Sequence, residues 1–308
     1  MNETFWTTAG VPRSNLRDFW MEAVGRAIND VDLCIEDSET FQASLRQRKL
    51  GPLSLSHIDV HGTQIVRRTR SIVARCEPAL FSVIHMVAGQ GWLRQLGREV
   101  AFCQDQCVIV DNREPYEIAI VGRGESLSIH MSAAWLTDQV PDARHVVATS
   151  LSRSSPWAGR LMDLMRALSF DGPSDVSTDL FVQHFGSTLA LAVNHIATPG
   201  PISRNGFCAL QMTLAELLSV PNLRVEDVAR SHQISVRQVH HVYAAQGTTF
   251  RSELIRLRLE RAHAMLVSER FRSVPVEEIA RRCGFSDASH FRRRFRQHFD
   301  ASPAALRQ

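Results

Sequence analysis

The chain has 308 residues, of which 44% are hydrophobic and 22% are charged, a composition typical of a folded globular protein that is long enough for two domains. No apolar run reaches the ~18 residues that a membrane-spanning helix needs, and the first ten residues lack the pattern of a secretory signal. We therefore expect a cytoplasmic protein with no membrane partner. The six cysteines form no Cys-x-x-Cys pair, which predicts free thiols and no zinc site.

The net charge of +3 is unevenly distributed along the chain. From Cys208 to the C-terminus there are 16 arginines and ten acidic residues, whereas acidic residues outnumber basic ones before Cys208. Lys49 is the only lysine, so arginine supplies nearly all of the positive charge. Because a guanidinium group binds phosphate and guanine through two parallel hydrogen bonds, the basic C-terminal part predicts a polyanionic partner.

The first two thirds of the chain predict a strand-rich domain with a few helices. Apolar residues recur at helical spacing between 15 and 28, and strand-like segments separated by glycine and proline then follow as far as Met131. This pattern is typical of a β-barrel or a β-sandwich. The expected strands are 53–60, 64–69, 80–88, 92–96, 107–110, 116–121 and 126–131. Two helices, at 156–169 and 178–196, have surplus apolar surface, which fits either packing on the barrel or a dimer interface.

A linker is expected at 198–206, where two prolines and two glycines lie within nine residues. The linker divides the chain into an N-terminal domain, residues 1–197, and a C-terminal domain, residues 207–308. The fold class that follows is α+β: a β-barrel with accessory helices, followed by an all-α domain.

The C-terminal domain is expected to be helical, with one pattern that occurs twice. In each copy a short helix, a tight turn and a second helix with a polar outer face form a helix-turn-helix unit. Ser235 is placed to cap the second helix of the first unit, and Gly247 is placed to end it. The expected helices are 207–219, 225–231, 235–246, 249–268, 276–282 and 287–299.

The long helix at 249–268 joins the two helix-turn-helix units. At 1.5 Å per residue it spans ~30 Å, which is close to the ~34–36 Å of one turn of B-DNA. A single chain can therefore place two recognition helices in successive major grooves, an arrangement that otherwise needs a dimer. Phe291, Phe295 and Phe299 recur every four residues and mark the buried face of the second recognition helix, which leaves its arginines outside.

Four segments of the C-terminal domain carry a specific sequence pattern. They are Val225 to Ala229, Ser235 to Gly247, Arg258 to Ala262, and Ile279 to Phe291 with Phe295, Phe299, Ser302 and Pro303. In these segments the chain resembles the AraC/XylS family of bacterial transcription regulators. The resemblance implies a regulator that binds double-stranded DNA sequence-specifically and works with RNA polymerase.

The N-terminal domain carries a second, less specific pattern. It consists of the strand-rich segments, a hairpin at 81–96, the segment 105–112 followed by Pro115 and Tyr116, and the two helices that follow. In this pattern the domain is similar to the cupin-like effector-binding domain of the family's catabolic branch. The similarity implies an activator of a catabolic operon that responds to a small effector, for example an aromatic one, and that can form a homodimer.

The resemblance also implies which side chains contact DNA. The base-contacting positions are Arg237, His240, His241, Ser289, His290 and Arg293, and the phosphate-contacting positions are Gln238, Arg292 and Arg296. Arg237 and Arg293 are the best candidates for guanine, because arginine to guanine is the commonest specific contact. The expected effector-binding residues, chosen for their chemistry and not from the resemblance, are Phe81, Trp92, Arg94 and Tyr116, although the three aromatic ones fit the barrel core equally well. The candidates to pair with the carboxylate of an aromatic acid are Arg67, Arg68 and Arg94.

In the C-terminal domain, two positions depart from the family pattern. Arg224 replaces a small capping residue at the start of the first unit's leading helix, which predicts weak capping. Asp300 replaces a glycine after the last helix, where aspartate is a mild departure because it adopts the left-handed conformation more readily than most residues.

Two other functions compete with a ligand-responsive activator. The first is a constitutive DNA-binding repressor or dimeric regulator without an effector. The second is a cupin enzyme fused to a DNA-binding domain, with a metal held by the strand histidines His57, His61, His85 and His130. Such an enzyme needs a His-x-His group with a carboxylate, and these histidines lack that spacing. We therefore expect no enzymatic activity, no metal and no cofactor.

Overall fold

A computed structural model of the chain describes residues 3–75, 80–168, 170, 177–194, 205–268 and 271–307. The chain forms two compact units, Met1–Asn205 and Gly206–Gln308. The predicted linker, 198–206, lies outside the described residues as far as residue 204. Its last two residues are the first two of the helix Asn205–Leu217.

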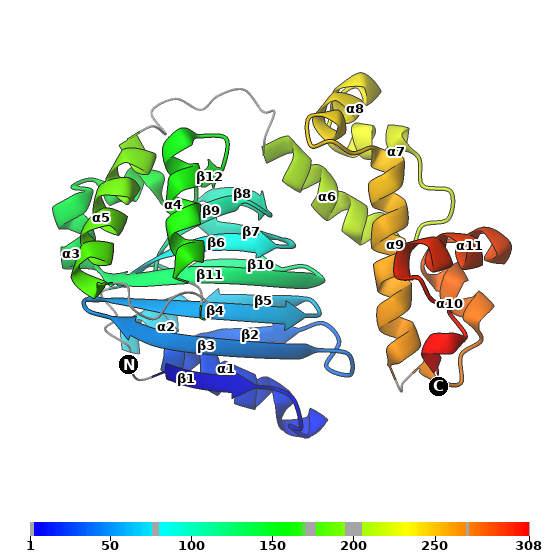
Figure 1. Cartoon of the computed structure of the whole chain (residues 1–308), viewed down its shortest axis with the longest axis horizontal. Helices are drawn as coiled ribbons and strands as arrows, with labels where there is room; N and C mark the ends of the chain where they lie inside the picture. The colour runs from blue at the N-terminus through cyan, green and yellow to red at the C-terminus, as the bar shows by residue number, and fades with distance from the viewer. Residues whose placement is uncertain are drawn as a thin grey trace. The chain divides into compact units, whose positions relative to one another are not determined.

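The N-terminal unit contains two antiparallel β-sheets (Figure 1). The larger sheet has the strand order β1-β3-β4-β11-β6-β9-β12, and the smaller has the order β2-β5-β10-β7-β8. The strands of the larger sheet are β1 Glu3–Thr7, β3 Gln42–Leu50, β4 Leu53–His61, β6 Leu80–Ala88, β9 Gln106–Asp111, β11 Arg123–Ser132 and β12 Ser150–Ser152. Those of the smaller sheet are β2 Asp32–Ile35, β5 Gln64–Arg68, β7 Gln90–Gln95, β8 Arg98–Cys103 and β10 Tyr116–Ile120.

Each sheet has an outer face and an inner face that looks toward the other sheet. Hydrogen bonds between the sheets identify the inner faces. The Arg68 guanidinium of β5 donates to the backbone carbonyl of Asn112, and Asn112 Nδ2 donates to Ser82 Oγ of β6, at 2.8 Å in both cases. Because side chains alternate along a strand, Phe81 and Val83 lie on the outer face of the larger sheet.

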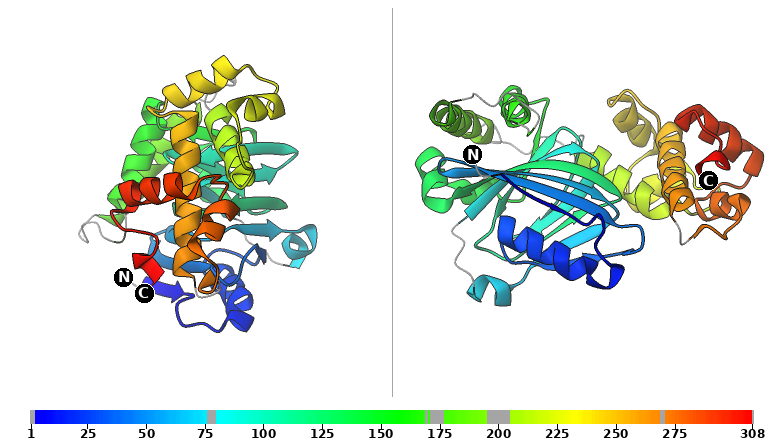
Figure 2. Two further views of the ribbon diagram at one scale, coloured as in Figure 1. Left: turned by 90° about the vertical axis from the view of Figure 1, so that its right-hand side faces the viewer. Right: turned by 60° about the horizontal axis from the view of Figure 1, so that its bottom comes forward.

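Helices cover two sides of this unit (Figure 2). α3 and α4 pack on the outer face of the larger sheet, with α5 against them, and α1 lies against β2 and β3. The amphipathic α1 buries Trp20 completely, and the indole N–H of Trp20 donates to Gln64 of β5 at 2.8 Å. The helices are α1 Leu16–Ala27, α2 Arg70–Arg75, α3 Ala133–Gln139, α4 Pro156–Ala167 and α5 Thr178–Asn194, with 3-10 turns η1 Arg13–Asn15 and η2 Ala143–Val146.

The predicted hairpin at 81–96 is wrong. β6 pairs with β9 and β11 in the larger sheet, whereas β7 pairs with β8 and β10 in the smaller sheet. The chain passes between the sheets at Gly89, where φ is +93° and a Cβ atom would lie 2.2 Å from the carbonyl oxygen of Arg123. The glycine therefore marks a close approach of two backbones and not a hairpin turn. The prediction also lacks β1, β2, β3, β8 and β12, because polar residues obscure the alternation in segments such as β3.

The C-terminal unit is all-helical and has the predicted order of elements (Figure 1). α7 and α8 form the first helix-turn-helix unit, α10 and α11 form the second, and α9 joins them. The helices are α6 Asn205–Leu217, α7 Val225–Ser231, α8 Val236–Ala244, α9 Phe250–Val267, α10 Val276–Arg282 and α11 Ala288–Phe299, with a final 3-10 turn η4 Ala305–Arg307. The two helix-turn-helix units have separate apolar cores, one around Val239 and Tyr243 and the other around Ile279 and Phe291. None of the described helices of the chain is long and apolar enough to cross a membrane.

Side chains at the helix ends largely follow the predictions. Ser235 Oγ accepts a hydrogen bond from the Gln238 backbone at 3.2 Å, and Gln238 Oε1 accepts one from the Ser235 backbone at 2.8 Å, so a capping box starts α8. The Arg224 side chain does not cap α7, as expected, but the carboxylate of Asp227 accepts the Arg224 backbone N–H at 3.0 Å. Asp300 adopts the left-handed conformation with a φ of +52°.

The cysteines follow the prediction only in part. Cys34, Cys107 and Cys283 are free, and the last two are buried. Cys103 is disulfide-bonded, so the expectation of free thiols throughout is wrong. Burial raises the pKa of the Cys283 thiol to about 11, which keeps this thiol protonated and unreactive at neutral pH.

Candidate nucleic-acid interface and effector site

The first recognition helix, α8, has one buried face and one exposed face. Val239, Val242 and Tyr243 are buried in the core of the first helix-turn-helix unit. The predicted DNA-contacting residues of this helix are all exposed, namely Arg237, Gln238, His240 and His241. The side-chain oxygen of Gln238 is used in the capping box, so its amide nitrogen is the atom left to donate to a phosphate.

The second recognition helix, α11, has the same two-faced character. Phe291 and Phe295 are fully buried, with ring centroids 5.4 Å apart, and Phe299 continues the stripe at 4.7 Å from Phe295. The exposed predicted residues of this helix are Ser289, Arg292, Arg293 and Arg296. His290 is only half-exposed, because its ring packs 6.0 Å from the ring of Phe285.

The charges around α11 distinguish its arginines from one another. The guanidinium of Arg292 forms an ion pair with the carboxylate of Glu277 in α10, so part of its charge is already neutralised. Burial lowers the pKa of His290, and the neighbouring Arg293 and Arg294 lower it further. A neutral imidazole has one donor and one acceptor nitrogen, so His290 can bind either kind of group on a base edge.

Helix α9 contributes a basic residue that the sequence did not single out. Arg251, at the exposed start of α9, also lowers the pKa of His290 and therefore lies near α11. Arg251 is one of four arginines in α9 and belongs to no sequence motif, so only its position near α11 identifies it. The same end of α9 is fixed to the first unit through Glu253, which accepts hydrogen bonds from Gln211 Nε2 at 3.0 Å and Thr248 Oγ1 at 3.1 Å.

In the N-terminal unit, the inner faces of the two sheets enclose a connected polar cluster. Its members are Ser56, Ser82, Asn112, His130 and Arg68. His130 Nδ1 lies 2.8 Å from Ser82 Oγ, and His130 Nε2 lies 3.1 Å from Ser56 Oγ. Burial lowers the pKa of His130 to about 4, so the ring is neutral at pH 7.

Arg68 is the charged member of this polar cluster and is only 1% exposed. Its Nε donates to the Asn112 carbonyl at 2.8 Å and its Nη1 to the Asp30 carbonyl at 2.5 Å, while Nη2 is buried without a hydrogen-bond partner. Carbonyl partners satisfy the N–H groups of a guanidinium group but do not neutralise its charge, so the binding of an anion is favourable there. The other two candidates for an effector carboxylate, Arg67 and Arg94, lie on the outer face of the smaller sheet and share one carboxylate partner.

One of the four predicted effector-binding residues lies at the polar cluster. Tyr116 is buried on the inner face of β10, and burial raises the pKa of its hydroxyl group to about 12. Trp92 and Arg94 lie on the outer face of β7, where the guanidinium carbon of Arg94 is 4.4 Å from the centroid of the Trp92 ring. Phe81 lies on the outer face of β6, with the guanidinium carbon of Arg113 4.6 Å from its ring centroid. The structure therefore does not bring these four side chains together.

The strand histidines do not converge on one point. His57 and His85 are both in register with Leu127 and lie on the outer face of the larger sheet, whereas His130 lies on the inner face. His61 is exposed at the end of β4. Within the described residues, no group of three or more His, Cys, Asp or Glu side chains is arranged to hold a metal ion.

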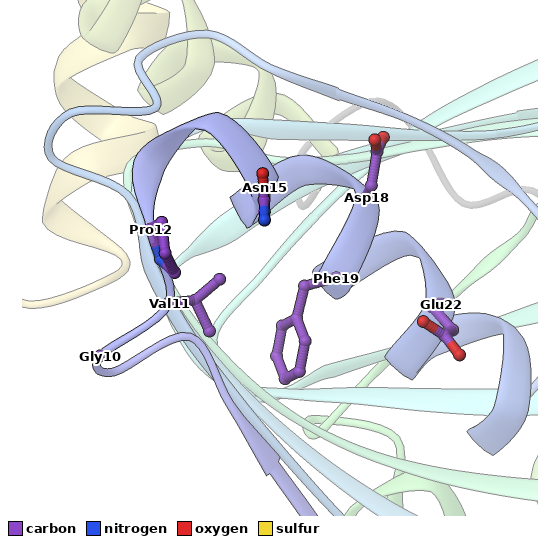
Figure 3. Close-up of a pocket in the computed structure, with 7 residues that line it drawn as sticks. All are labelled: Gly10, Val11, Pro12, Asn15, Asp18, Phe19 and Glu22. Atoms are coloured by element: carbon purple, nitrogen blue, oxygen red, sulfur yellow. The ribbon is translucent and has the colours of Figure 1, made fainter.

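A surface hollow lies beside the start of α1 (Figure 3). It is lined by Gly10, Val11, Pro12, Asn15, Asp18, Phe19 and Glu22. These residues come from the loop before α1 and from one side of that helix, and none belongs to the polar cluster. Both charged side chains of the lining are acidic, so the hollow does not suit an anionic ligand.

An all-helical unit with two exposed recognition helices, in a chain that also has a β-rich unit with a polar interior, defines a DNA-binding transcription regulator with a separate effector-binding domain. Residues 20–193 match the AraC-binding-like domain family, and residues 211–308 match a helix-turn-helix domain family. Because the first match covers more than half of the chain, the chain belongs to the AraC/XylS family of transcription regulators, as the sequence predicted. Its N-terminal unit has the cupin-like fold of that family.

Individual relatives agree with this assignment. The transcriptional activator NphR of Rhodococcus sp is 24% identical over 300 residues, which cover 94% of this chain and 88% of NphR. The HTH-type transcriptional activator RhaS of Escherichia coli is 42% identical over 82 residues, but these cover only 26% of this chain and 28% of RhaS. The crystal structure of the AraC-like transcriptional activator CuxR superimposes with a TM-score of 0.55 at 14% identity, over 85% of this chain and 95% of CuxR, which shows the shared fold.

Proposed function

We propose that this protein is a ligand-responsive activator of a catabolic operon that acts in the cytoplasm with RNA polymerase. The relative that aligns with 94% of the chain is named as an activator, which supports activation over repression. In this proposal residues 1–197 bind the effector, residues 198–206 connect the domains and residues 207–308 bind DNA.

Both recognition helices contact DNA in this proposal. The observation that carries it is the repeated arrangement of α8 and α11, each with exposed polar side chains opposite a buried apolar stripe. We assign base contacts to Arg237, His240, His241, Ser289, His290 and Arg293, and phosphate contacts to Gln238, Arg292 and Arg296. The geometry supports Arg296 more than Arg292 for phosphate, because Arg292 is already paired with Glu277.

Selection of duplexes from a random pool by the full-length protein tests this assignment. Two conserved half-sites about one helical turn apart are expected, since one chain presents two recognition helices. If the duplexes selected at a fixed salt concentration share no common sequence, sequence-specific binding is refuted. Transcription in vitro from a promoter that carries the selected site, with and without the protein, then separates an activator from a repressor.

The effector in this proposal is a small carboxylate that binds Arg68. A carboxylate would give the buried Nη2 of Arg68 an acceptor and would neutralise a guanidinium group that now has only carbonyl partners. Tyr116 lies near enough to Arg68 for that charge to act on the pKa of its hydroxyl group, so an aromatic wall is present beside the cation. An aromatic carboxylate fits this combination of groups.

The thermal unfolding of the full-length protein tests the effector. Benzoate is expected to raise the Tm of the wild-type protein, whereas benzamide, which is neutral and similar in shape, is expected to leave it unchanged. Arg68→Met is expected to abolish the benzoate shift, and Arg94→Met, on the outer face, is expected to retain it. Absence of any shift with a panel of aromatic and aliphatic carboxylates, together with unaltered operator binding, would favour a constitutive regulator.

We also infer that the protein forms a homodimer through α5. Leu180 and Leu191 are 58% and 41% exposed, and with His184 and Ser187 they form one stripe along the outer side of this helix. Large exposed apolar side chains in such a stripe are typical of a helix that packs against a second copy. Leu191→Arg is expected to convert a dimer to a monomer in sedimentation experiments, and an unchanged sedimentation coefficient would contradict the assignment.

The protein acts by binding and not by catalysis in this proposal. The support is the separation of the strand histidines, since His85 and His130 lie on opposite faces of one sheet and both have pKa values lowered by burial to about 4. The family relatives are named as activators, in agreement. Metal analysis of protein purified without chelator tests this inference, and a stoichiometric transition metal would contradict it.

A further inference from the structure

The middle of α9 contains a buried charged residue, Arg258, which is only 8% exposed. Its Nε donates to the Leu218 carbonyl at 2.8 Å, and its Nη2 donates to the Val220 carbonyl at 2.7 Å. These two carbonyls directly follow the C-terminal end of α6, which reaches α9 at this point (Figure 1). A helix C-terminus leaves carbonyl groups without partners, and a cation there is doubly favourable because it also meets the negative end of the helix dipole.

The turn of the second helix-turn-helix unit packs against the same guanidinium group. Phe285 lies with its ring centroid 5.9 Å from the guanidinium carbon of Arg258. At Gly284, where φ is +82°, a Cβ atom would lie 2.4 Å from the Leu218 carbonyl oxygen and 2.7 Å from Arg258 Nη2. The end of α6, the middle of α9 and the turn between α10 and α11 therefore meet at one side chain, with no room for a methyl group between them.

This junction lies between the two apolar cores of the C-terminal unit. Leu254, one turn before Arg258, belongs to the core of the first helix-turn-helix unit, and Leu259, directly after it, belongs to the core of the second. Apolar packing stabilises each helix-turn-helix unit separately. The directional hydrogen bonds of Arg258, in contrast, tie α9 to the end of α6, a helix that packs in the first core. The turn that precedes the recognition helix of the second unit packs on the same guanidinium group.

We propose that Arg258 is a positioning residue that fixes the second recognition helix relative to the first, and so sets the spacing of half-sites that the protein accepts. The inference rests on the proposed contact of both units with DNA. Two recognition helices held rigidly bind one duplex with the combined strength of both contacts only when the half-site spacing matches their separation. If the junction loosens, the combined strength falls and the spacing becomes less strictly required.

The test compares full-length variants on three duplexes derived from the selected operator. The first duplex has both half-sites at the selected spacing, the second has one base pair inserted between them, and the third has the second half-site scrambled. Arg258→Met removes both hydrogen bonds, and Arg258→Lys keeps the charge but cannot reach both carbonyls with a planar fork. Arg261→Met is the matched control, because Arg261 is exposed on the same helix.

For the wild-type protein and for Arg261→Met, the insertion is expected to lower the affinity by about tenfold or more. For Arg258→Met and Arg258→Lys, the affinity for the intact operator is expected to fall by about tenfold and the further loss on insertion to shrink to less than about threefold. Affinity for the duplex with one half-site is expected to stay within about twofold of wild type, which a general loss of folded protein would not produce.

The results that would overturn the positioning role of Arg258 differ from those that would refute the contact of both units with DNA. An insertion penalty that stays at the wild-type value in folded Arg258→Lys would overturn the positioning role, and so would an equal loss on the duplex with one half-site. Should Arg258→Met fail to fold, as judged by circular dichroism, Arg258→Lys and Gly284→Ala decide the matter, because the added methyl group strains the same junction from the other side. A selected operator with only one conserved half-site would instead refute the proposed two-unit contact.

Discussion

Arg292 of α11 is ion-paired with Glu277 of α10, whereas Arg296, one turn further along the same helix, is exposed and forms no ion pair with any residue that the structure describes. An internal ion pair competes with a DNA phosphate for the same guanidinium group. The arginines of α11 therefore differ in how much of their charge is available, although the sequence presents them as one basic run.

We predict that Arg296→Ala weakens binding to all duplexes alike and reduces the slope of log affinity against log salt concentration by about 1, as the loss of one phosphate contact does. Arg292→Ala is expected to have a smaller effect, because part of its charge is neutralised by Glu277. Glu277→Gln is expected to raise affinity, since it releases Arg292. Titrations at several salt concentrations measure these slopes, and a larger loss for Arg292→Ala than for Arg296→Ala would contradict the ranking.

Substitution of Arg293 is expected to have a different effect from substitution of Arg296, because Arg293 is assigned to a base and not to a phosphate. Arg293→Ala is expected to relax specificity at one base pair and to cost about 1–3 kcal/mol on the selected operator. On a duplex already mutated at that base pair, the variant and the wild type are expected to bind equally. Arg237→Ala should act in the same way on the other half-site. Uniform losses of affinity on every sequence would show that Arg293 binds the backbone.

The C-terminal fold could be predicted from the sequence because its signals are local. The Phe291–Phe295–Phe299 stripe, the cap at Ser235 and the positive φ of Gly247 all act within one helix or at its end. What the sequence could not show is the pairing of Arg292 with Glu277, or the meeting of Arg258 with Gly284. These contacts join segments that are 15 residues or more apart and depend on how the helices pack.

The N-terminal fold was harder to predict, because its order comes from pairing between distant strands. The predicted hairpin at 81–96 places Gly89 in a turn, yet Gly89 is the point at which the chain leaves one sheet for the other. For the effector site, the sequence offered aromatic and basic residues of the right kind but not the face of the sheet on which each lies. Alternation places Tyr116 inside, whereas Trp92 and Arg94, on a neighbouring strand, lie outside.

The two helix starts in the first helix-turn-helix unit predict opposite stability changes. Arg224 gives α7 no side-chain cap, so Arg224→Ser is expected to raise the stability of the C-terminal unit by up to about 1 kcal/mol. Ser235 already caps α8, so Ser235→Ala is expected to lower it by about 1 kcal/mol. Hydrogen exchange of peptides from the C-terminal unit measures both changes in the intact chain. Equal protection in the two variants would contradict the prediction.

The buried His130 predicts that the N-terminal unit loses stability in mild acid. Its pKa is about 4 in the folded state, because burial disfavours the charged ring, against an ordinary value of 6.5 when unfolded. Between these two values the unfolded state binds more protons than the folded state. The free energy of unfolding is therefore at its full value above pH 6.5 and decreases as the pH falls toward 4. The loss is about 3 kcal/mol at most. His85, which is buried and lies near Arg166, adds to it in the same direction.

Tryptophan fluorescence measures this effect selectively, because all five tryptophans precede residue 158 and so report on the N-terminal unit alone. Urea unfolding followed by this signal between pH 7 and pH 5 should show a falling free energy of unfolding in the wild-type protein. His130→Gln keeps a donor and an acceptor for Ser82 and Ser56 but cannot titrate, so its stability should fall less steeply with pH. The control His61→Gln changes an exposed histidine and should retain the wild-type slope. Identical slopes for His130→Gln and the wild type would mean that the protonation of His130 does not limit the acid stability of this unit.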